Sequence, residues 1–367
     1  MRSKHACVAA LALCALLAAS PSRCDITFGG QARAFAMGGA GIAILDRSDR
    51  TTPLNPASLA LLNRRVKLRL PSIGLRASGI SLQAAIDHLF THPSQNDAVS
   101  LARDFGSRQS DFGVSLAWGM RFGHLDLDAD GVATAHVIPN AALVTWAKTA
   151  NGDVHKLTGA EQADLLAAAV YSLPQIGLAE RISPRGSPIH VETGVRIKLA
   201  RAVYTHYIVN ANNIAHNTAA VPAPELAGGT TITQDGIGMD FGLLIHPAER
   251  HGFSGAVVVT NLVDPRFIIT GTDASGAATR YELQPRSVSA GSAYTSGKIV
   301  LAYDLVDIGR AYGPLQHRLG AEYRTRGVAL RAGYSSVRGF TGGFGWGFLD
   351  FAFGARAPLE VTQSLRF

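Results

Sequence analysis

The sequence predicts an all-β fold, a transmembrane antiparallel β-barrel of about fourteen strands with short helical insertions. Three observations lead to this prediction. Only 17% of the 367 residues are charged, against roughly 25% in an ordinary soluble domain. The chain contains 39 glycines without a Gly-X-Y period, which excludes collagen. Behind the N-terminus, apolar side chains alternate with small or polar ones, as they do in strands with one face in lipid.

The composition excludes three other classes of protein. Because 47% of the residues are hydrophobic, the chain is not a disordered protein, which would be hydrophilic and highly charged. The mean hydropathy of +0.14 is too low for a bundle of membrane helices, and no later apolar run reaches the roughly 18 residues of a spanning helix. The net charge of +7 is scattered, without a basic cluster of the kind that binds nucleic acid. We therefore expect no nucleic-acid partner.

Residues 1–22 are predicted to be a secretory signal peptide. Arg2 and Lys4 form a short basic start, residues 7–19 are an unbroken apolar run, and small residues follow it. This order is typical of an export signal, and the run is too short to cross a hydrocarbon core of about 30 Å. The less favoured alternative is a buried N-terminal helix. Cleavage would lower the net charge by two to +5 and leave at most Cys24 of the cysteines, so we expect no internal disulfide.

The alternation is clearest in the second half of the chain. Apolar side chains, most of them large, take most of the alternate positions there, in residues 237–245, 253–259, 299–305, 319–323 and 328–334. In a soluble β-sandwich this face would point inward, whereas in an outer-membrane barrel it faces lipid while Gly, Asp and Ser line the inside. A sheet within a bilayer must also close on itself, because every backbone N–H and C=O there needs a partner.

Two hairpins are predicted by a short internal repeat. Residues 122–127 resemble residues 346–351, and in both the apolar positions change parity across a glycine, Gly123 or Gly347. A change of parity at a glycine is typical of a tight hairpin turn. The repeat favours a barrel whose strands follow one another as a meander.

Two short helices are predicted in the first half of the chain. Thr158 and Glu161 have the spacing of a capping box ahead of the apolar residues 165–171, and residues 82–90 form the second segment. Neither reaches the length of a spanning helix, so we expect both to be loop insertions or lids.

The C-terminal residues predict an assembly signal. Leu359, Val361, Gln363, Leu365 and Phe367 alternate along a final strand that ends on an aromatic side chain. In a membrane barrel such aromatics lie at the membrane–water interface. The tail resembles the terminal signature of bacterial outer-membrane barrels. This resemblance implies that Leu365 and Phe367 form the signal, that the barrel-assembly machinery and outer-membrane lipid are partners, and that the protein lies in the cell outer membrane.

The segment that follows the signal peptide resembles a known family. Residues 31–46 read QARAFAMGGAGIAILD, and residues 54–60 read LNPASLA. These stretches are similar to the opening of the long-chain fatty acid transporter (FadL-type) superfamily of outer-membrane barrels, which includes PorV-like relatives associated with type IX secretion and TraF-like conjugal-transfer barrels. In the fatty acid transporters the matching residues lie in an N-terminal hatch that plugs the barrel. The resemblance implies a hatch over residues 25–62 and a barrel over residues 63–367.

The resemblance implies seven candidate site residues in this hatch: Gly38, Gly39, Gly41, Asp46, Asn55, Pro56 and Ala57. An Asn before a Pro favours extended or turn geometry and can hydrogen-bond its own backbone, which predicts a rigid corner. The three glycines would let the segment pack closely against the inner wall. The acidic doublet common in the family stands here as Asp46-Arg47, and no position matches the family's substrate-pocket residues.

No motif predicts catalysis, a cofactor or a metal site. The zinc-helix, nucleophile-elbow and Walker patterns are missing from the sequence. Gly39-x-Gly41 is followed by Ile44, where a dinucleotide fingerprint needs a third small residue. His190 and Glu192 share one strand face, a pair more typical of lumen lining than of a metal site. We therefore expect a non-enzyme without catalytic residues, cofactors or metal ligands.

Two functions remain open. The first is transport of a hydrophobic, fatty-acid-like small molecule across the outer membrane, with the hatch gating the lumen. The alternative is a non-transporting barrel that serves as a scaffold or shuttle for an exported protein in secretion or conjugal transfer. Apolar residues facing the lumen near the hatch would favour transport, whereas a polar, plugged lumen with long ordered extracellular loops would favour the scaffold. A soluble periplasmic β-sandwich, the third possibility, requires buried aromatic faces.

Overall fold

The computed structural model describes residues 32–45, 54–62, 66–78, 110–123, 125–149, 153–212, 231–249, 251–272, 278–283, 286–309, 315–337, 339–346, 349–354 and 359–363. Four features predicted from the sequence lie outside these residues. They are the signal peptide over residues 1–22, the hatch residue Asp46, the helix over residues 82–90, and the pair Leu365 and Phe367.

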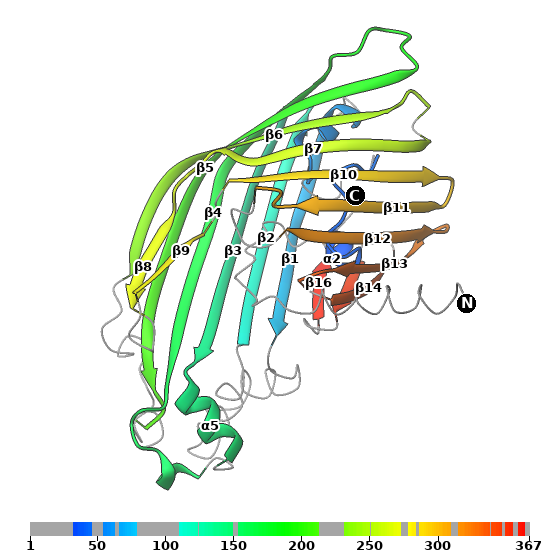
Figure 1. The fold of residues 1–367 in the computed structure, drawn as a ribbon. Coiled ribbons are helices and arrows are strands. Elements are labelled where there is room, and N and C mark those ends of the chain that lie inside the picture. Colours follow the sequence, from blue (N-terminus) through cyan, green and yellow to red (C-terminus); the bar gives the residue numbers. More distant parts are fainter. Residues whose placement is uncertain are drawn as a thin grey trace, which may run out of the picture.

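Antiparallel strands make up most of the described chain. The strands of the main sheet are β1 (Lys67–Ser78), β2 (Ser110–Phe122), β3 (Leu125–Pro139), β4 (Gln162–Arg181), β5 (Ile189–Asn210), β6 (Ile232–Pro247), β7 (Gly252–Val263), β10 (Ser287–Ser296), β11 (Ile299–Val306), β12 (Gln316–Arg324), β13 (Val328–Ser335), β14 (Gly339–Trp346), β15 (Leu349–Gly354) and β16 (Leu359–Gln363). β1 pairs with both β2 and β16, so these fourteen described strands form a closed barrel (Figure 1). Its order follows the sequence, except that β7 pairs with β10. The prediction of an all-β antiparallel fold is confirmed.

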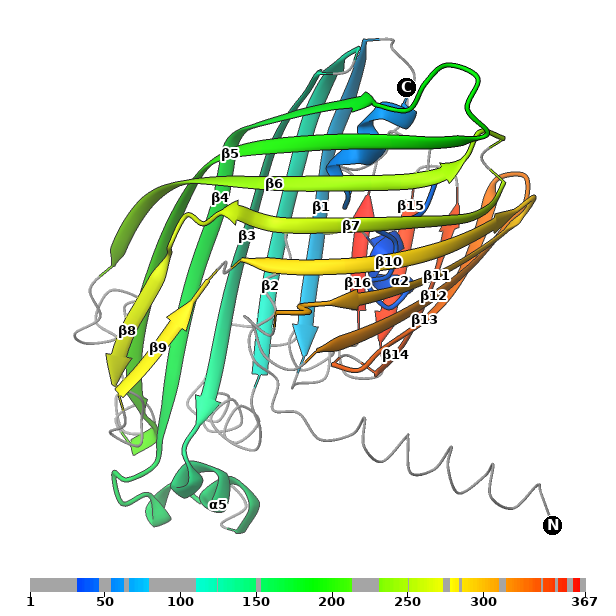
Figure 2. The same ribbon diagram turned by 45° about the horizontal axis from the view of Figure 1, so that its top comes forward.

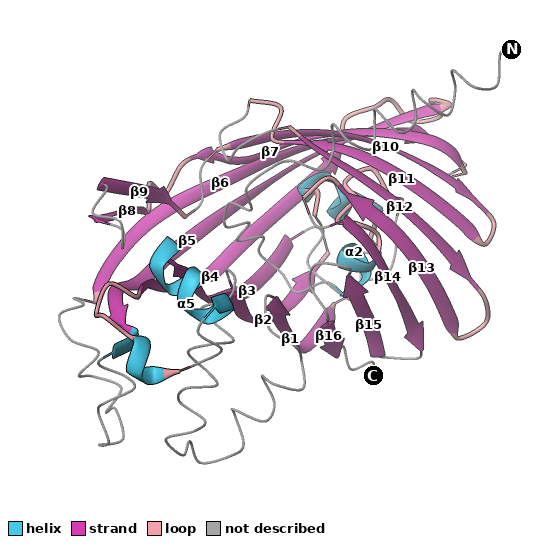
Figure 3. Ribbon diagram, turned by 60° about the horizontal axis from the view of Figure 1, so that its bottom comes forward, coloured by secondary structure: helices cyan, strands magenta, loops and turns pink. Residues whose placement is uncertain are grey.

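The remaining elements lie within the ring or beyond its ends. β8 (Ile268–Thr272) and β9 (Ala278–Glu282) form a separate two-stranded sheet between β7 and β10 in the sequence (Figure 2). The described helices are α2 (Ala32–Ala36), η1 (Pro56–Leu61), α5 (Ala141–Thr149) and η2 (Val154–Lys156). Figure 3 shows α2 among the strands and α5 beyond the strand ends. No helix in the described part of the chain is long and apolar enough to cross a membrane.

The two faces of the barrel wall are inverted relative to a soluble protein, which exposes charge and buries apolar side chains. In β6, Ile237 and Ile245 are 57% and 43% exposed, whereas Asp240 between them is 5% exposed. Exposed apolar side chains recur on the outer face at Val114, Leu116, Trp118, Leu199, Phe253, Leu301, Leu319, Leu330, Phe344 and Phe353. Charged side chains are buried on the inner face at Asp126, Glu192, Lys198, Asp240, Asp304, Arg318, Glu322 and Arg331.

Both predicted hairpins are present. Phe122 pairs with Leu125 between β2 and β3, and Trp346 pairs with Leu349 between β14 and β15. Gly123 in the first turn has a φ of 66°, in the left-handed region that glycine adopts without steric cost. The change of apolar parity therefore lies between two paired strands in each case, and Gly347 itself lies outside the described residues.

The helix predicted after Thr158 and Glu161 is wrong, because β4 begins there. The bonds of the capping box do form, since the backbone N–H and the hydroxyl of Thr158 donate to the Glu161 carboxylate. Burial acts to raise the pKa of Glu161, but hydrogen bonds from Thr158 and Gly159 hold it below its usual value. Residues 165–171 are apolar on both faces, which hides the period of two in the sequence. Their ladders with β3 and β5 make them a strand.

A helix that the sequence did not predict lies just before β4. The Oδ1 atom of Asn140 accepts the Leu143 N–H at 2.9 Å and caps α5, as an asparagine at a helix start commonly does. Leu143 and Trp146 are buried together with Ala163 at the start of β4. This small apolar cluster holds α5 against the end of the barrel.

Candidate functional site

The N-terminal part of the described chain contacts the inner face of the barrel. We call residues 32–45 and 54–62 the inner segment. Its helix α2 contacts β13, β14, β15 and β16, whereas η1 contacts β4, β5 and β6. The two helices of the inner segment therefore rest on different parts of the wall.

Gly38 and Gly39 end α2 with a Schellman motif. The Gly39 N–H donates to the carbonyl of Ala34 at 2.7 Å, and the Gly38 N–H donates to that of Phe35 at 2.9 Å. The two glycines have φ values of 70° and 83°, which other residues adopt only with strain. A Cβ at Gly38 would also lie 2.7 Å from the carbonyl oxygen of Leu319. Gly38 thus serves both the turn and the close approach to the wall.

Side chains of the wall satisfy backbone groups of the inner segment that follow this turn. Asp304 of β11 accepts the N–H groups of Gly41 and Ile42 through Oδ2, at 2.7 and 3.1 Å. Ser254 of β7 donates its hydroxyl to the carbonyl of Ala43 at 2.7 Å. Backbone groups without a partner are costly to bury, so these two wall residues make the close packing of the turn possible.

Asn55 forms a corner that joins the inner segment to β6. It is 1% exposed, and its Oδ1 atom accepts the Ala57 N–H at 2.9 Å, which caps η1 with Pro56 in the first turn. Its Nδ2 atom donates to the carbonyls of Ile42 and Leu243, both at 3.1 Å. One amide group therefore connects the glycine turn, the start of η1 and the wall.

Glycines on the inner face of the wall make room for the inner segment. A Cβ added at Gly177 would lie 2.7 Å from Cδ1 of Leu59, and one added at Gly320 would lie 2.7 Å from Cβ of Met37. Added side chains at Gly194, Gly242, Gly291, Gly333 and Gly343 would collide in the same way with Pro56, Asn55, Ile42, Gly38 and Ala36. Packed carbon atoms lie about 3.5–4.0 Å apart, so the inner segment fits only because these wall positions lack side chains.

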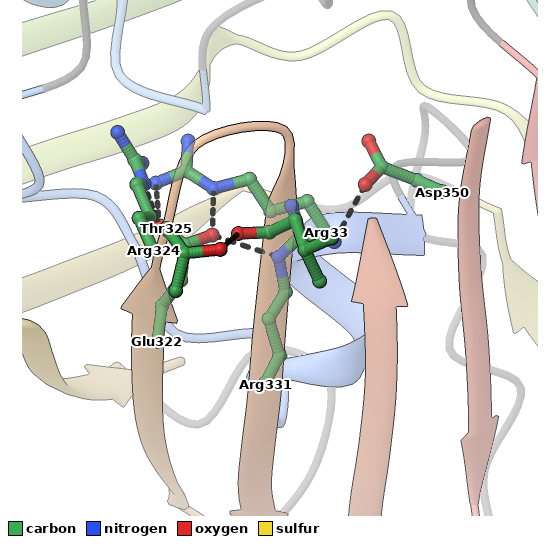
Figure 4. A network of polar contacts seen from close by, with 7 residues as sticks. Arg33, Glu322, Arg324, Thr325, Arg331 and Asp350 are labelled. Carbon is green, nitrogen blue, oxygen red and sulfur yellow. Dashed lines mark hydrogen bonds and ion pairs between the residues drawn. The ribbon is translucent and has the colours of Figure 1, made fainter. Parts of the chain in front are cut away.

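Arg33 connects α2 to a buried network of charges on the wall (Figure 4). Glu322 of β12 accepts hydrogen bonds from Arg33 at 2.9 Å, from Arg331 at 2.7 Å, and from Arg324. Arg331 also donates to Asp350 of β15 at 2.6 Å. Glu322 is 2% exposed, and three guanidinium groups surround it. Such charge-assisted bonds are among the stronger ones in proteins, so the network anchors α2 to β12, β13 and β15.

A second polar cluster lies where the wall is irregular. The β6–β7 register shifts between Met239 and Phe241, and the N–H of Asn261 donates to Oδ1 of Asp240 at 2.9 Å. Lys198 of β5 donates to both Asp240 and Asn261 at 2.7 Å. A bulge leaves backbone groups without ladder partners, and here the side chains of the cluster take over that role.

Apolar side chains also face inward, close to the β8–β9 sheet. The buried members of this cluster are Val132, Leu166, Ala168, Val170, Ala200, Ala202, Tyr204, Phe267 and Leu283. Phe267 and Leu283 flank the β8–β9 sheet, and the hydroxyl of Tyr204 donates to the carbonyl of Ile268 at 3.0 Å. The β8–β9 sheet therefore covers an apolar part of the inner wall of β3, β4 and β5.

Six of the seven candidate site residues predicted from the sequence lie in the inner segment, and Asp46 lies outside the described residues. The glycine turn and the corner approach each other, since a Cβ at Gly41 would lie 3.5 Å from Leu54, next to Asn55. Sequence reasoning missed the wall partners Ser254, Asp304, Glu322 and Thr341. Thr341 of β14 accepts the Gly38 N–H and donates to the carbonyl of Ala36. These four partners lie 211 to 305 positions from the residues that they bind. Their only signal in the sequence was a small or charged residue at an inward position of a strand.

Comparison with known proteins gave matches to solved structures alone, because no family model and no curated protein matches the chain. The Pseudomonas putida toluene transporter TodX is 14% identical, with a TM-score of 0.49, over 91% of this chain and 95% of that one. The monoaromatic hydrocarbon channel CymD is 11% identical, with a TM-score of 0.30, over 92% and 97%. Escherichia coli outer membrane phospholipase A is 11% identical, with a TM-score of 0.28, over 82% and 96%. These values are too low to assign the chain to a family.

Proposed function

We propose that the chain is an outer-membrane barrel that transports a hydrophobic small molecule, with the inner segment as the gate of its lumen. The observation that carries this proposal is the inverted wall. Phe253 and Trp346 on the outer face are 74% and 67% exposed, whereas Asp304 and Glu322 on the inner face are 0% and 2% exposed. A continuous apolar outer face is unfavourable in water and favourable against lipid. Outer-membrane lipid is therefore the partner proposed for this face.

The apolar parts of the inner wall favour a hydrophobic cargo. Leu244, Val258 and Val300 face inward and pack in one cluster with Ile42 of the inner segment. If the inner segment moved, this wall would become an apolar surface inside the lumen. Such a surface suits a fatty-acid-like or aromatic molecule better than a polar solute. The cluster around Phe267 is a second apolar surface, beside the β8–β9 sheet.

The attachment of the inner segment is compatible with a gate. Its neutral hydrogen bonds to the wall each contribute about 0.5–1.5 kcal/mol net, and those to charged groups about 1.5–3 kcal/mol, because water can replace the partner that is lost. The barrel itself is held by continuous backbone ladders, which do not include the inner segment. The segment can therefore shift without opening the wall. Its resemblance to the hatch of FadL-type transporters, in residues 31–46 and 54–60, also supports this role.

Uptake through the outer membrane tests the proposal. The full chain is expressed in a Gram-negative host that lacks its own hydrophobic-compound channels. Fractionation and the gel shift between boiled and unboiled samples establish that the barrel has inserted. We expect faster uptake of a fluorescent long-chain fatty acid or a monoaromatic compound than in the host alone, with no comparable gain for a disaccharide. Equal uptake with and without the inserted protein would contradict the proposal.

A scaffold for an exported protein is the second candidate. The wall glycines that fit the inner segment favour it, because a permanent plug would be matched to its wall in the same way. A scaffold would give no uptake and would instead co-purify with one exported protein from the outer-membrane fraction. Neither candidate assigns a catalytic role to the chain.

A further inference from the structure

Three side chains with metal-binding atoms meet on the inner face of the barrel, where β5 begins and β6 ends. His190 lies directly opposite His246 in the β5–β6 ladder, and Glu192 is two positions further along β5 on the same face. One ligand atom from each of the three residues lies within 4.8 Å of the other two. The sequence showed His190 and Glu192 as a pair, and the strand register adds His246 from 54 positions away.

The hydrogen bonds of His246 leave one ring nitrogen directed at Glu192. Its Nδ1 atom is 2.7 Å from the carbonyl oxygen of Pro247, and a carbonyl can only accept, so Nδ1 carries a proton. Its Nε2 atom lies 3.4 Å from Oε1 of Glu192. In the neutral ring Nε2 is an acceptor, as is the carboxylate oxygen, so a cation or a second proton is needed between them. A backbone carbonyl on the far nitrogen is the usual outer partner of a metal-binding histidine.

Glu192 also has a carboxylate oxygen that the described residues leave without a partner. The residue is 0% exposed, and its Oε1 atom accepts a hydrogen bond from Arg181 at 2.9 Å. Its Oε2 atom is buried and has no hydrogen-bond donor among the described residues. A buried acceptor without a donor is costly. The Arg181 side chain is 37% exposed and can turn outward, which would free the second oxygen as well.

We propose that His190, Glu192 and His246 bind a divalent transition-metal ion of the Zn²⁺, Ni²⁺ or Cu²⁺ class. Two imidazole nitrogens with one carboxylate oxygen suit these ions, whereas Ca²⁺ and Mg²⁺ prefer oxygen ligands alone. Three protein ligands leave at least one coordination position open to water or another donor.

The site lies beside the contact between the wall and η1. Gly194 is the next inward position of β5 after Glu192, and it pairs with Gly242 of β6. A Cβ at Gly194 or Gly242 would collide with Pro56 or Asn55 of the inner segment. A metal ion bound to both strands would fix them at the place where η1 rests. The site does not depend on whether the barrel transports a hydrophobic molecule.

Metal binding by the full chain, purified in detergent without a histidine tag, tests this proposal. After treatment with a chelator, equilibrium dialysis against Zn²⁺ should give one bound ion per chain. His246→Ala and Glu192→Gln should each weaken Zn²⁺ binding at least about tenfold. Loss of a residue that only hydrogen-bonds to a metal ligand already lowers metal affinity by about tenfold or more. His206→Gln is the matched control, because His206 also lies on β5 and pairs with Asp164 of β4 at 2.9 Å, outside the three-residue group found among the described residues. It should bind Zn²⁺ like the wild type.

A spectroscopic measurement on the unaltered chain covers the case in which a variant fails to fold, as judged by the gel shift. Cu²⁺ bound to the wild type should give an electron paramagnetic resonance spectrum with splitting from two nitrogen ligands. Absence of stoichiometric Zn²⁺ binding, or a Cu²⁺ spectrum without nitrogen ligands, would overturn the proposal. His246 and Glu192 would then form a hydrogen-bonded pair alone. Loss of binding in His206→Gln equal to that in His246→Ala would also overturn it.

Discussion

Arg33 and Glu322 lie 289 positions apart in the sequence, yet their side chains form two hydrogen bonds within the barrel, Nε to Oε2 at 2.9 Å and Nη2 to Oε1 at 3.2 Å. A two-point bond between a guanidinium and a carboxylate fixes orientation as well as distance. The pair therefore sets the position of α2 on the wall. Replacing Arg33 and replacing Glu322 should therefore have different consequences.

Replacing Arg33 by alanine should loosen α2 and leave the wall intact. Glu322 would keep Arg324 and Arg331 as partners, so no buried charge would lose all its partners. We expect normal insertion and a greater leak of small polar solutes, measured by their entry into cells. Glu322→Ala should instead lower the free energy of unfolding by about 3–5 kcal/mol, because it removes the one carboxylate that the Arg33, Arg324 and Arg331 guanidinium groups share and leaves three like charges close together. An equal loss of insertion in both variants would contradict this distinction.

Asn55→Asp separates the capping of η1 from its attachment to the wall. A carboxylate can still accept the Ala57 N–H, but it cannot donate to the carbonyls of Ile42 and Leu243. Because the new carboxylate would face two carbonyl acceptors, the substitution should detach the corner from β6. In an inserted barrel, hydrogen exchange of the η1 amides should then be faster than in the wild type. Asn140→Asp is the matched control, since Asn140 caps α5 and also donates to a carbonyl. Unchanged exchange in η1 of Asn55→Asp would count against the role of this corner.

The strands were predictable from the sequence where one face is apolar and the other is not. In residues 237–245 the alternation is a local property, because side chains of a strand point to opposite faces. The hairpins at Gly123 and Gly347 were predictable for the same reason. The helix prediction for residues 165–171 was wrong because the inner face of this strand is also apolar and packs with Phe267. The local capping bonds of Glu161 could not reveal that a strand follows.

The partners of the inner segment were not predictable from single positions. Asp304 and Ser254 bind its backbone only because the ring of strands brings β11 and β7 around it. The glycines that accommodate it, such as Gly194 and Gly333, look like ordinary strand glycines in the sequence. The inward parity of these positions is a signal, but it becomes useful only when strand register is known.

Gly333→Ala should push the inner segment away from β13. The added Cβ would collide with the backbone of Met37 and Gly38, which cannot move aside as a flexible side chain can. We expect the barrel to insert and its permeability to polar solutes to rise. Gly255→Ala in β7 is the control, because the nearest atom to its Cβ, the Gly291 carbonyl oxygen, is 4.0 Å away. A similar leak in both variants would show that the effect does not come from the inner segment.

Leu301→Arg tests whether the outer face contacts lipid. Leu301 of β11 is 48% exposed, and an arginine near the bilayer midplane should cost about 2–4 kcal/mol of unfolding free energy. Ile182, which is 62% exposed in the turn after β4, is the control. Ile182→Arg should lower the unfolding free energy by only about 0–1 kcal/mol, the cost of an arginine near the membrane–water interface. Urea unfolding in lipid vesicles measures both. Equally small losses would mean that this face does not lie in the membrane.

Cross-linking the inner segment to the wall tests most directly whether its movement lets cargo pass. A Cβ at Gly320 would lie 2.7 Å from that of Met37, and a disulfide needs about 3.8 Å, so a small shift allows Met37→Cys and Gly320→Cys to join. In a Cys24→Ser background, uptake of a fluorescent long-chain fatty acid is measured in the same cells before and after reduction. The two single-cysteine variants are controls. We expect little uptake in the oxidised state and, after reduction, the rate of the Gly320→Cys single variant. Equal uptake in both states, with the cross-link complete, would contradict a moving gate.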